Sequence, residues 1–160
     1  MIDEKGFRAG VVVIIVNDKK EIFLARRIKQ DAWQFPQGGL LKDETVKQAM
    51  YRELHEETGL TKKDVKILSV SKKWLYYYLP KRLIRYYSRP LCIGQKQKWF
   101  LLHFVGKEKN INFNLTDSPE FDGYKWVDYW QPLNEVISFK RKVYRKALQE
   151  FAPMLFSVKK

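Results

Sequence analysis

Residues 52–60 of the chain read RELHEETGL and place three carboxylates, Glu53, Glu56 and Glu57, within about one and a half helical turns. Like charges three or four residues apart on a helix repel one another, so this spacing costs stability. If these glutamates were an ordinary run of solvated charges, they would lie on the exposed face of the helix. On a helical wheel, however, Glu53 and Glu57 fall on the apolar stripe and Glu56 falls at its edge. Carboxylates in such a position need a cation among them.

The apolar stripe that these carboxylates extend consists of Val46, Ala49, Met50 and Leu54. Hard divalent cations such as Mg²⁺ or Mn²⁺ prefer oxygen ligands and commonly bridge to substrate phosphates. His55 points away from the stripe and is not expected to be a ligand. Arg52 is expected to orient or neutralise Glu56 or Glu44 rather than to contact substrate. The sequence therefore predicts a divalent-metal site on this helix.

The glutamates belong to a wider pattern, G-x5-E-x7-R-E-U-x-E-E-x-G-U, where U is a bulky aliphatic residue. Its fixed positions are Gly38, Glu44, Arg52, Glu53, Leu54, Glu56, Glu57, Gly59 and Leu60. The pattern resembles the Nudix box of hydrolases that cut a nucleoside diphosphate linked to another group. The resemblance implies an α/β/α sandwich in which the three glutamates of the helix ligate metal or act as the base. A backbone carbonyl at Gln37 or Gly38 would be a further ligand, and metal-activated water would attack phosphorus.

The elements that must position this site can be read from periodicity and turn chemistry. Strands are expected at Val11–Val16, Glu21–Arg26, Val65–Val70, Trp74–Tyr78, Trp99–Val105 and Tyr124–Val127, and Trp33–Phe35 is a short apolar stretch before Pro36. Helices are expected at about Thr45–Thr58 and Phe139–Phe151. Asp43 or Thr45 is expected to cap the first helix, Gly59 to end it, and Gln37–Gly39 to form a flexible loop. We expect one α+β domain with a mixed sheet between helices, spanning 1–160, with a core over about 6–151 and a short C-terminal tail.

The chain carries 31 basic and 18 acidic residues, a net charge of +13. This surplus favours a polyanionic partner, although a generically basic surface would give the same number. The single cysteine, Cys92, excludes an intrachain disulfide. The first residues are not typical of a signal peptide, and the apolar run Val11–Val16 is too short to cross a membrane. We therefore expect a cytoplasmic protein with no membrane partner.

The charge is distributed unevenly, because residues 65–107 contain no aspartate or glutamate. The segment holds ten cations: Lys66, Lys72, Lys73, Lys81, Arg82, Arg85, Arg89, Lys96, Lys98 and Lys107. Aromatic residues alternate with them, namely Trp74, Tyr76, Tyr77, Tyr78, Tyr86, Tyr87 and Trp99. Cations suit phosphates and rings suit unstacked bases, so the pattern favours single-stranded RNA. The alternative is that many of the rings belong to the core and the cations are scattered over the surface.

Stretches that lie mostly outside the box narrow the resemblance to the RNA pyrophosphohydrolases of bacteria. They include WQFPQGG at 33–39, QAMYREL at 48–54, LPKR at 79–82, CIGQKQKWFLL at 92–102, PEFDGY at 119–124 and SFKR at 138–141. The implied activity is removal of pyrophosphate from triphosphorylated 5′ ends of RNA, which leaves a monophosphate that marks transcripts for decay. Two other functions remain open, a dinucleoside polyphosphate hydrolase and a non-catalytic RNA-binding module. The complete set of box glutamates disfavours the second.

The same resemblance assigns roles to residues outside the box. Glu120 matches an extra carboxylate opposite the box that ligates metal or acts as the base, although without the resemblance it would be an ordinary loop acid. Arg8 matches a phosphate-contacting arginine. Arg27, Phe139 and Lys140 match positions around an early base of the RNA, where an arginine plane and a ring could sandwich a purine. Arg27 could instead pair with a surface acid.

Overall fold

Eight strands form one mixed sheet in the part of the chain that this computed structural model describes, residues 1–156. The strands are β1 (Phe7–Val16), β2 (Ile22–Arg27), β3 (Trp33–Gln34), β4 (Gln37–Gly39), β5 (Val65–Val70), β6 (Leu75–Tyr78), β7 (Gly94–Phe104) and β8 (Phe121–Val127). The central order is β3-β2-β1-β7-β5, with β4 paired to β1, β6 to β7 and β8 to β2. Strands β1 and β7 run parallel over ten residue pairs and the other pairs run antiparallel, which confirms the predicted mixed sheet.

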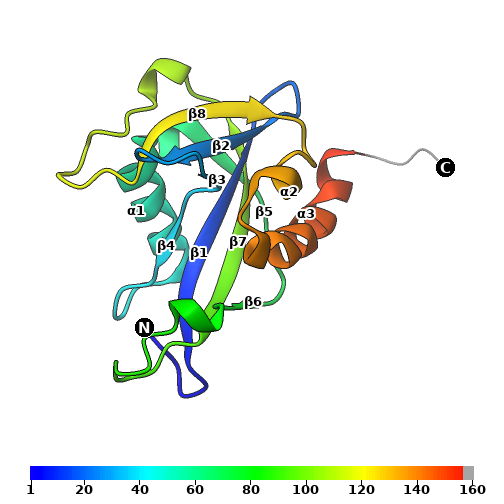
Figure 1. The fold of residues 1–160 in the computed structure, drawn as a ribbon. Helices are drawn as coiled ribbons and strands as arrows, with labels where there is room; N and C mark the ends of the chain where they lie inside the picture. Colours follow the sequence, from blue (N-terminus) through cyan, green and yellow to red (C-terminus); the bar gives the residue numbers. More distant parts are fainter. Residues whose placement is uncertain (157–160) are drawn as a thin grey trace.

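Helices cover both faces of this sheet (Figure 1). Helix α1 (Val46–Thr58) lies on one face, and α2 (Pro132–Glu135) and α3 (Arg141–Leu155) lie on the other. Alternate residues of β1 explain the two layers, since Val11 and Val13 pack with α1 while Val12 and Ile14 pack with α3. A strand buried on both faces reads as a continuous apolar run, as Val11–Val16 does. The α/β/α sandwich is therefore confirmed.

Four predicted elements need correction. Strand β7 begins at Gly94 rather than Trp99, and β8 begins at Phe121 rather than Tyr124, because pairing with neighbouring strands holds polar residues that show no strand-like pattern. Residues 37–39 form strand β4 rather than a flexible loop, since they pair with Gly10–Val12 of β1. The last helix begins at Arg141, after a 3-10 turn over residues 138–140, and continues to Leu155.

In the core between the sheet and α3, a buried hydrogen bond joins the helix to the loop between β3 and β4. The Tyr144 hydroxyl accepts a hydrogen bond from the Phe35 backbone N–H at 3.1 Å, and the two rings stack with their centroids 4.7 Å apart. None of the helices within residues 1–156 is long and apolar enough to span a membrane. The last four residues of the predicted C-terminal tail, 157–160, lie outside the described residues.

Candidate active site

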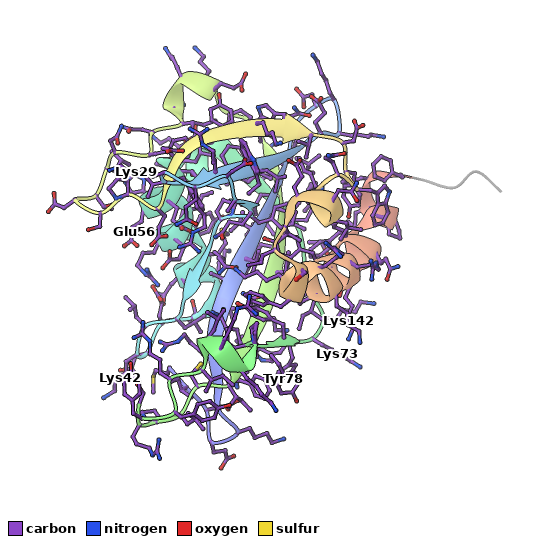
Figure 2. The ribbon with its side chains drawn as sticks, in the orientation of Figure 1. Lys29, Lys42, Glu56, Lys73, Tyr78 and Lys142 are labelled. Atoms are coloured by element: carbon purple, nitrogen blue, oxygen red, sulfur yellow. The ribbon has the colours of Figure 1, made fainter. Side chains whose placement is uncertain are left out.

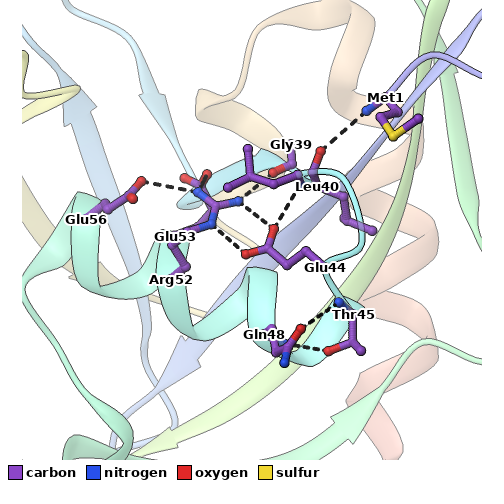
Figure 3. Close-up of polar contacts among 10 residues, drawn as sticks. Met1, Gly39, Leu40, Glu44, Thr45, Gln48, Arg52, Glu53 and Glu56 are labelled. Carbon is purple, nitrogen blue, oxygen red and sulfur yellow. Dashed lines mark hydrogen bonds and ion pairs between the residues drawn. The ribbon is translucent and has the colours of Figure 1, made fainter.

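The helix that carries the glutamates has well-defined ends. The Thr45 hydroxyl accepts a hydrogen bond from the Gln48 N–H at 3.1 Å, and the Gln48 side chain accepts one from the Thr45 N–H at 3.0 Å. This capping box is drawn in Figure 3 and selects Thr45 over Asp43 as the cap. At the other end Gly59 has φ 80°, a left-handed conformation that favours glycine, and its N–H reaches the His55 carbonyl.

The burial of residues along α1 confirms the buried face that the helical wheel predicts. Ala49, Met50 and Leu54 are fully buried, and Glu57 is only 7% exposed although it is a carboxylate. The Glu53 side chain is 12% exposed and the Glu56 side chain 45%. The carboxylates therefore extend the buried stripe and open toward solvent at its edge, as the sequence predicts, whereas His55 is exposed.

Strand β4 lies directly beneath these carboxylates. A Cβ atom built on Gly38 would lie 1.9 Å from Glu53 Cδ, so only glycine leaves room for this side chain. The backbone N–H of Gln37 donates to Glu57 Oε1 at 2.8 Å. The backbone of residues 37–39 therefore comes close to the carboxylates of the helix. These residues belong to a strand that pairs with β1, so the Gln37 N–H is held in place by the sheet.

Arg52 links the acids of the box. Its guanidinium donates to both oxygens of Glu44, at 2.7 and 2.9 Å, and to the Gly39 carbonyl at 2.8 Å. It also donates to Glu53 at 2.6 Å and to Glu56 at 3.3 Å (Figure 3). The hydrogen bond to Arg52 holds the pKa of Glu44 below its ordinary value, and the hydrogen bond to Glu44 raises the pKa of Arg52. As predicted, Arg52 orients and neutralises acids of the box.

Burial raises the pKa of the two inner carboxyls, Glu53 and Glu57. Desolvation raises the pKa of Glu57 to about 9, and the neighbouring charge of Glu53 adds to this effect, while the Gln37 N–H opposes it. Desolvation also raises the pKa of Glu53, with the Arg52 hydrogen bond acting in the opposite direction. Among residues 1–156 the Glu57 carboxyl forms no ion pair and Glu53 pairs with Arg52 alone, so a bound divalent ion would compensate the charge that burial disfavours.

A cleft of about 580 Å³ opens over the carboxylates. It is lined by Arg27, Gln34, Gln37, Gly38, Gly39, Glu53, Glu56, Glu57, Thr116, Ser118 and Glu120. Glu120 precedes strand β8, and its charge contributes to the raised pKa of Glu57, so the structure brings it together with the box glutamates. Sequence reasoning missed Gln34, which lies in the short strand β3, and it missed Thr116 and Ser118, because the segment before Glu120 has no periodic pattern that would place its side chains.

The predicted RNA-contacting residues divide into two groups. Arg27 lines the cleft, and Lys140 lies close enough for the charge of Arg27 to affect it. Lys140 is only 7% exposed, and burial together with that charge lowers its pKa to about 8. Phe139 precedes it in the 3-10 turn and packs on Tyr77, with ring centroids 5.9 Å apart. Arg8 instead lines a separate cavity of about 360 Å³. It is not among the residues that line the carboxylate cleft.

The donor set suits a hard divalent cation, since it consists of carboxylates and backbone carbonyls. Within residues 1–156, however, no three acidic, histidine or cysteine side chains converge as a ready-made metal cage. Arg52 explains this arrangement, because it draws the carboxylates of Glu53 and Glu56 toward its own guanidinium. The buried Glu57 carboxyl, which forms no ion pair within residues 1–156, and the cleft over the carboxylates fit such an ion. An ion entering the cleft would compete with Arg52 for these oxygens.

Comparison with known proteins agrees with this geometry. The model of the NUDIX domain matches residues 6–147. The chain is 59% identical to an RNA pyrophosphohydrolase of Haemophilus influenzae over 157 residues, covering 98% of this chain and 80% of the relative. It is 57% identical to an RNA pyrophosphohydrolase of Pseudomonas fluorescens, covering 98% and 99% of the two chains.

Solved structures share the fold at low sequence identity. The dihydroneopterin triphosphate pyrophosphohydrolase of E. coli superposes with a TM-score of 0.70 at 21% identity, covering 90% of this chain and 98% of that one. An Ap4A hydrolase of C. elegans superposes with a TM-score of 0.65 at 18% identity, covering 91% and 98%. With the domain match over most of its length and these near full-length relatives, the chain belongs to the Nudix family of hydrolases that act on pyrophosphate bonds.

Proposed function

We propose that this protein removes pyrophosphate from triphosphorylated 5′ ends of RNA and leaves a 5′-monophosphate. The observation that carries the proposal is the buried carboxylate cluster on α1, which lies beside a cleft that also contains Arg27. Relatives at 57–59% identity over nearly the whole chain are named RNA pyrophosphohydrolases, which supports RNA as the substrate. The reaction would initiate decay of transcripts and would take place in the cytoplasm.

Nudix hydrolases use divalent metal ions, and we propose Mg²⁺ or Mn²⁺ here because both prefer oxygen ligands. Glu53, Glu56, Glu57 and Glu120 would hold the ion, with a backbone carbonyl of Gln37 or Gly38 as a further ligand. When bound, the ion supplies charge stabilisation at phosphate oxygens and a water of lowered pKa.

The residues of the chain prepare the cleft for that ion. The Gln37 N–H donates to Oε1 of Glu57 at 2.8 Å and so orients this carboxylate in the cleft. One of the four carboxylates that line the cleft, Glu53, Glu56, Glu57 or Glu120, would accept the proton of the attacking water. Arg52 acts as a positioning residue, because its contacts with Glu44 and the Gly39 carbonyl hold the helix against β4.

The remaining residues would select the RNA. Arg27 and Phe139 present a guanidinium plane and an aromatic ring, which can sandwich a base near the 5′ end. Lys140 would supply a cation beside them. Arg8, in the neighbouring cavity, would contact the phosphates only if its flexible side chain extends toward the cleft, since it is exposed on β1.

A product assay tests the proposal directly. A short RNA carrying a labelled 5′-triphosphate is incubated with the protein and Mg²⁺ or Mn²⁺, and the released phosphates are separated. We expect pyrophosphate and a 5′-monophosphorylated RNA, and the Glu53→Gln variant should lose the activity. Release of orthophosphate in steps, or undiminished hydrolysis by the variant, would contradict the proposal. A preference of several orders of magnitude for diadenosine tetraphosphate would assign the protein to the dinucleoside polyphosphate hydrolases instead.

A further inference from the structure

Three aromatic residues occupy alternate positions in and just before strand β6, namely Trp74, Tyr76 and Tyr78. Because successive side chains of a strand point to opposite faces, these three share one face and Tyr77 points to the other. Tyr77 is buried beside Phe139, under α3, whereas Tyr76 is 49% exposed and Tyr78 66% exposed. We call Trp74, Tyr76 and Tyr78 the aromatic platform; it lies on the face of the sheet opposite to α3.

Two lysines of the neighbouring strand β7 lie on the same face. Lys96 is paired with Tyr76 across the strands, and the Nζ atoms of Lys96 and Lys98 lie 5.4 and 5.8 Å from the centroid of the Trp74 ring. Lys96 pairs with Asp3 at 2.9 Å, but Lys98 donates to two backbone carbonyls, at 3.1 and 3.2 Å, so no carboxylate neutralises it among the described residues. The platform is therefore both aromatic and positively charged.

The exposed rings are already held in place. Phe7 of β1 is buried and contacts both tyrosines edge-on, with ring centroids 4.9 Å from Tyr76 and 5.3 Å from Tyr78. Exposed aromatic side chains that are fixed before binding lose little conformational entropy when a ligand stacks on them. Residues 65–107 also contain no acid, so this strand and its neighbour present no charge that would repel a polyanion.

We propose that the aromatic platform binds single-stranded RNA downstream of the nucleotides held at the carboxylate cleft. Bases would stack on the rings and backbone phosphates would pair with the lysines, which is how proteins bind single strands without reading their sequence. The proposal rests on the proposed function, since it assigns a second contact surface to the same substrate.

The platform and the α1 carboxylates of the cleft lie on the same face of the sheet but are separate. Val11 of β1 is paired with Gly38 of β4 on one side and with Lys98 of β7 on the other, and Lys98 reaches Trp74. Neighbouring strands are about 4.8 Å apart, so three strand spacings place β6 about 14 Å from β4. Figure 2 shows Tyr78 at the β6 end of the sheet, apart from Glu56 on α1. Only an RNA longer than the part bound at the cleft would contact both places.

The first test measures binding without catalysis. A fluorescent single-stranded RNA of about ten nucleotides, ending in a 5′-hydroxyl, is titrated with the parent protein and with two double variants. Tyr76→Ala with Tyr78→Ala should weaken binding at least about fivefold, since stacked bases lose affinity when the ring is removed. Tyr76→Phe with Tyr78→Phe keeps both rings and should bind as the parent does. Equal affinity of the parent and the alanine variant would overturn the proposal.

The second test separates this proposal from the proposed function. Hydrolysis of a triphosphorylated dinucleotide and of a triphosphorylated RNA of about ten nucleotides is compared for the same proteins. The alanine variant should show a higher KM for the longer RNA and unchanged kinetics on the dinucleotide. If the parent hydrolyses neither RNA, the proposed function fails. If the parent protein hydrolyses both RNAs and the alanine variant has the same kinetics on both, the platform proposal is wrong and the proposed function stands.

A third measurement uses only the unaltered chain, in case the alanine variant does not fold. RNA containing 4-thiouridine is cross-linked to the parent protein, and the modified peptides are identified by mass spectrometry. Cross-links at residues 74–78 or 96–98 support the platform, and their absence while other peptides are cross-linked overturns it.

If the alanine substitutions instead dissociate a dimer and leave RNA binding unchanged, the platform is a contact between two copies of the chain and the proposal is wrong.

Discussion

Glu57 makes the stability of the metal-free protein depend on pH in a predictable direction. Burial raises its pKa from 4.5 in the unfolded chain to about 9 in the folded protein. Between these values the folded protein keeps a proton on this carboxyl that the unfolded chain has released. Since the folded state then binds more protons, its stability is greatest below the lower pKa and is lost as the pH rises toward the higher one.

The size of the effect follows from the proton count. One proton difference changes the free energy of unfolding by about 1.4 kcal/mol per pH unit, so the fall from about pH 6 to about pH 8 amounts to at most about 3 kcal/mol. This is an upper limit, because the charge of the neighbouring Glu53 contributes to the raised pKa of Glu57 and the two carboxyls are coupled. The range stops near pH 8, where Lys140, whose pKa is lowered to about 8, begins to change stability in the opposite direction.

The assay is urea unfolding in the presence of a chelator, followed by tryptophan fluorescence at several pH values. Glu57→Gln is the matched control, because glutamine has nearly the same shape and no charge to titrate. The parent should lose stability as the pH rises, and the variant should lose less by the amount that Glu57 contributes.

Mg²⁺ or Mn²⁺ should stabilise the parent more at about pH 8 than at about pH 6, because a bound ion must displace the proton that Glu57 carries at lower pH. The variant should show a smaller gain at both values. Parallel pH profiles for the parent and the variant without metal would refute the reasoning, since they would mean that Glu57 is already ionised in the folded protein.

Three further substitutions have definite expected outcomes. Gly38→Ala would push the Glu53 carboxylate out of its place, so we expect hydrolysis to fall about a hundredfold or more while a thermal melt changes little. Arg52→Lys keeps the charge but loses the forked contacts, and should lower both the melting temperature and kcat; unchanged kcat would argue against its positioning role. Tyr144→Phe leaves the Phe35 N–H without its partner and should cost about 1–3 kcal/mol in chemical unfolding, with activity per folded molecule unchanged.

The catalytic helix could be predicted almost completely from the sequence, because its pattern is local. The spacing of Ala49, Met50 and Leu54 gives the buried face, Thr45 and Gly59 give the ends, and the position of Glu57 on the wheel gives its burial. Each of these properties depends on residues within a few turns of one another, so no knowledge of the rest of the chain is needed.

Strand β4 could not be predicted in this way. Its three residues include two glycines, which have low strand propensity, and only pairing with β1 makes them a strand. The polar residues at the start of β7 are strand for the same reason, since β1 and β6 flank them. Long-range pairing decides these segments, and a single sequence contains no direct record of it.

The aromatic residues of the acid-free segment show a similar division. Sequence analysis could not separate rings of the core from rings at the surface, and the structure buries Trp99 and Tyr77 while Tyr76 and Tyr78 stay exposed. Alternation along β6 explains why Tyr77 points to one face of the sheet and Tyr76 and Tyr78 to the other. Which of these faces is buried depends on the position of α3, which the sequence pattern of β6 does not give. The cleft residues Thr116 and Ser118 were missed because the irregular segment before β8 has no period.

The parallel pairing of β1 with β7 has a consequence for synthesis of the chain on the ribosome. Strand β1 ends at Val16, but the strand beside it begins only at Gly94, and β8, which pairs with β2, begins at Phe121. Helix α1 is therefore translated long before the sheet that buries its apolar face can close, and pairings so distant in sequence form slowly. The nascent protein must pass through a stage with the β1 edge and the α1 stripe uncovered, when it is most exposed to aggregation and to chaperones.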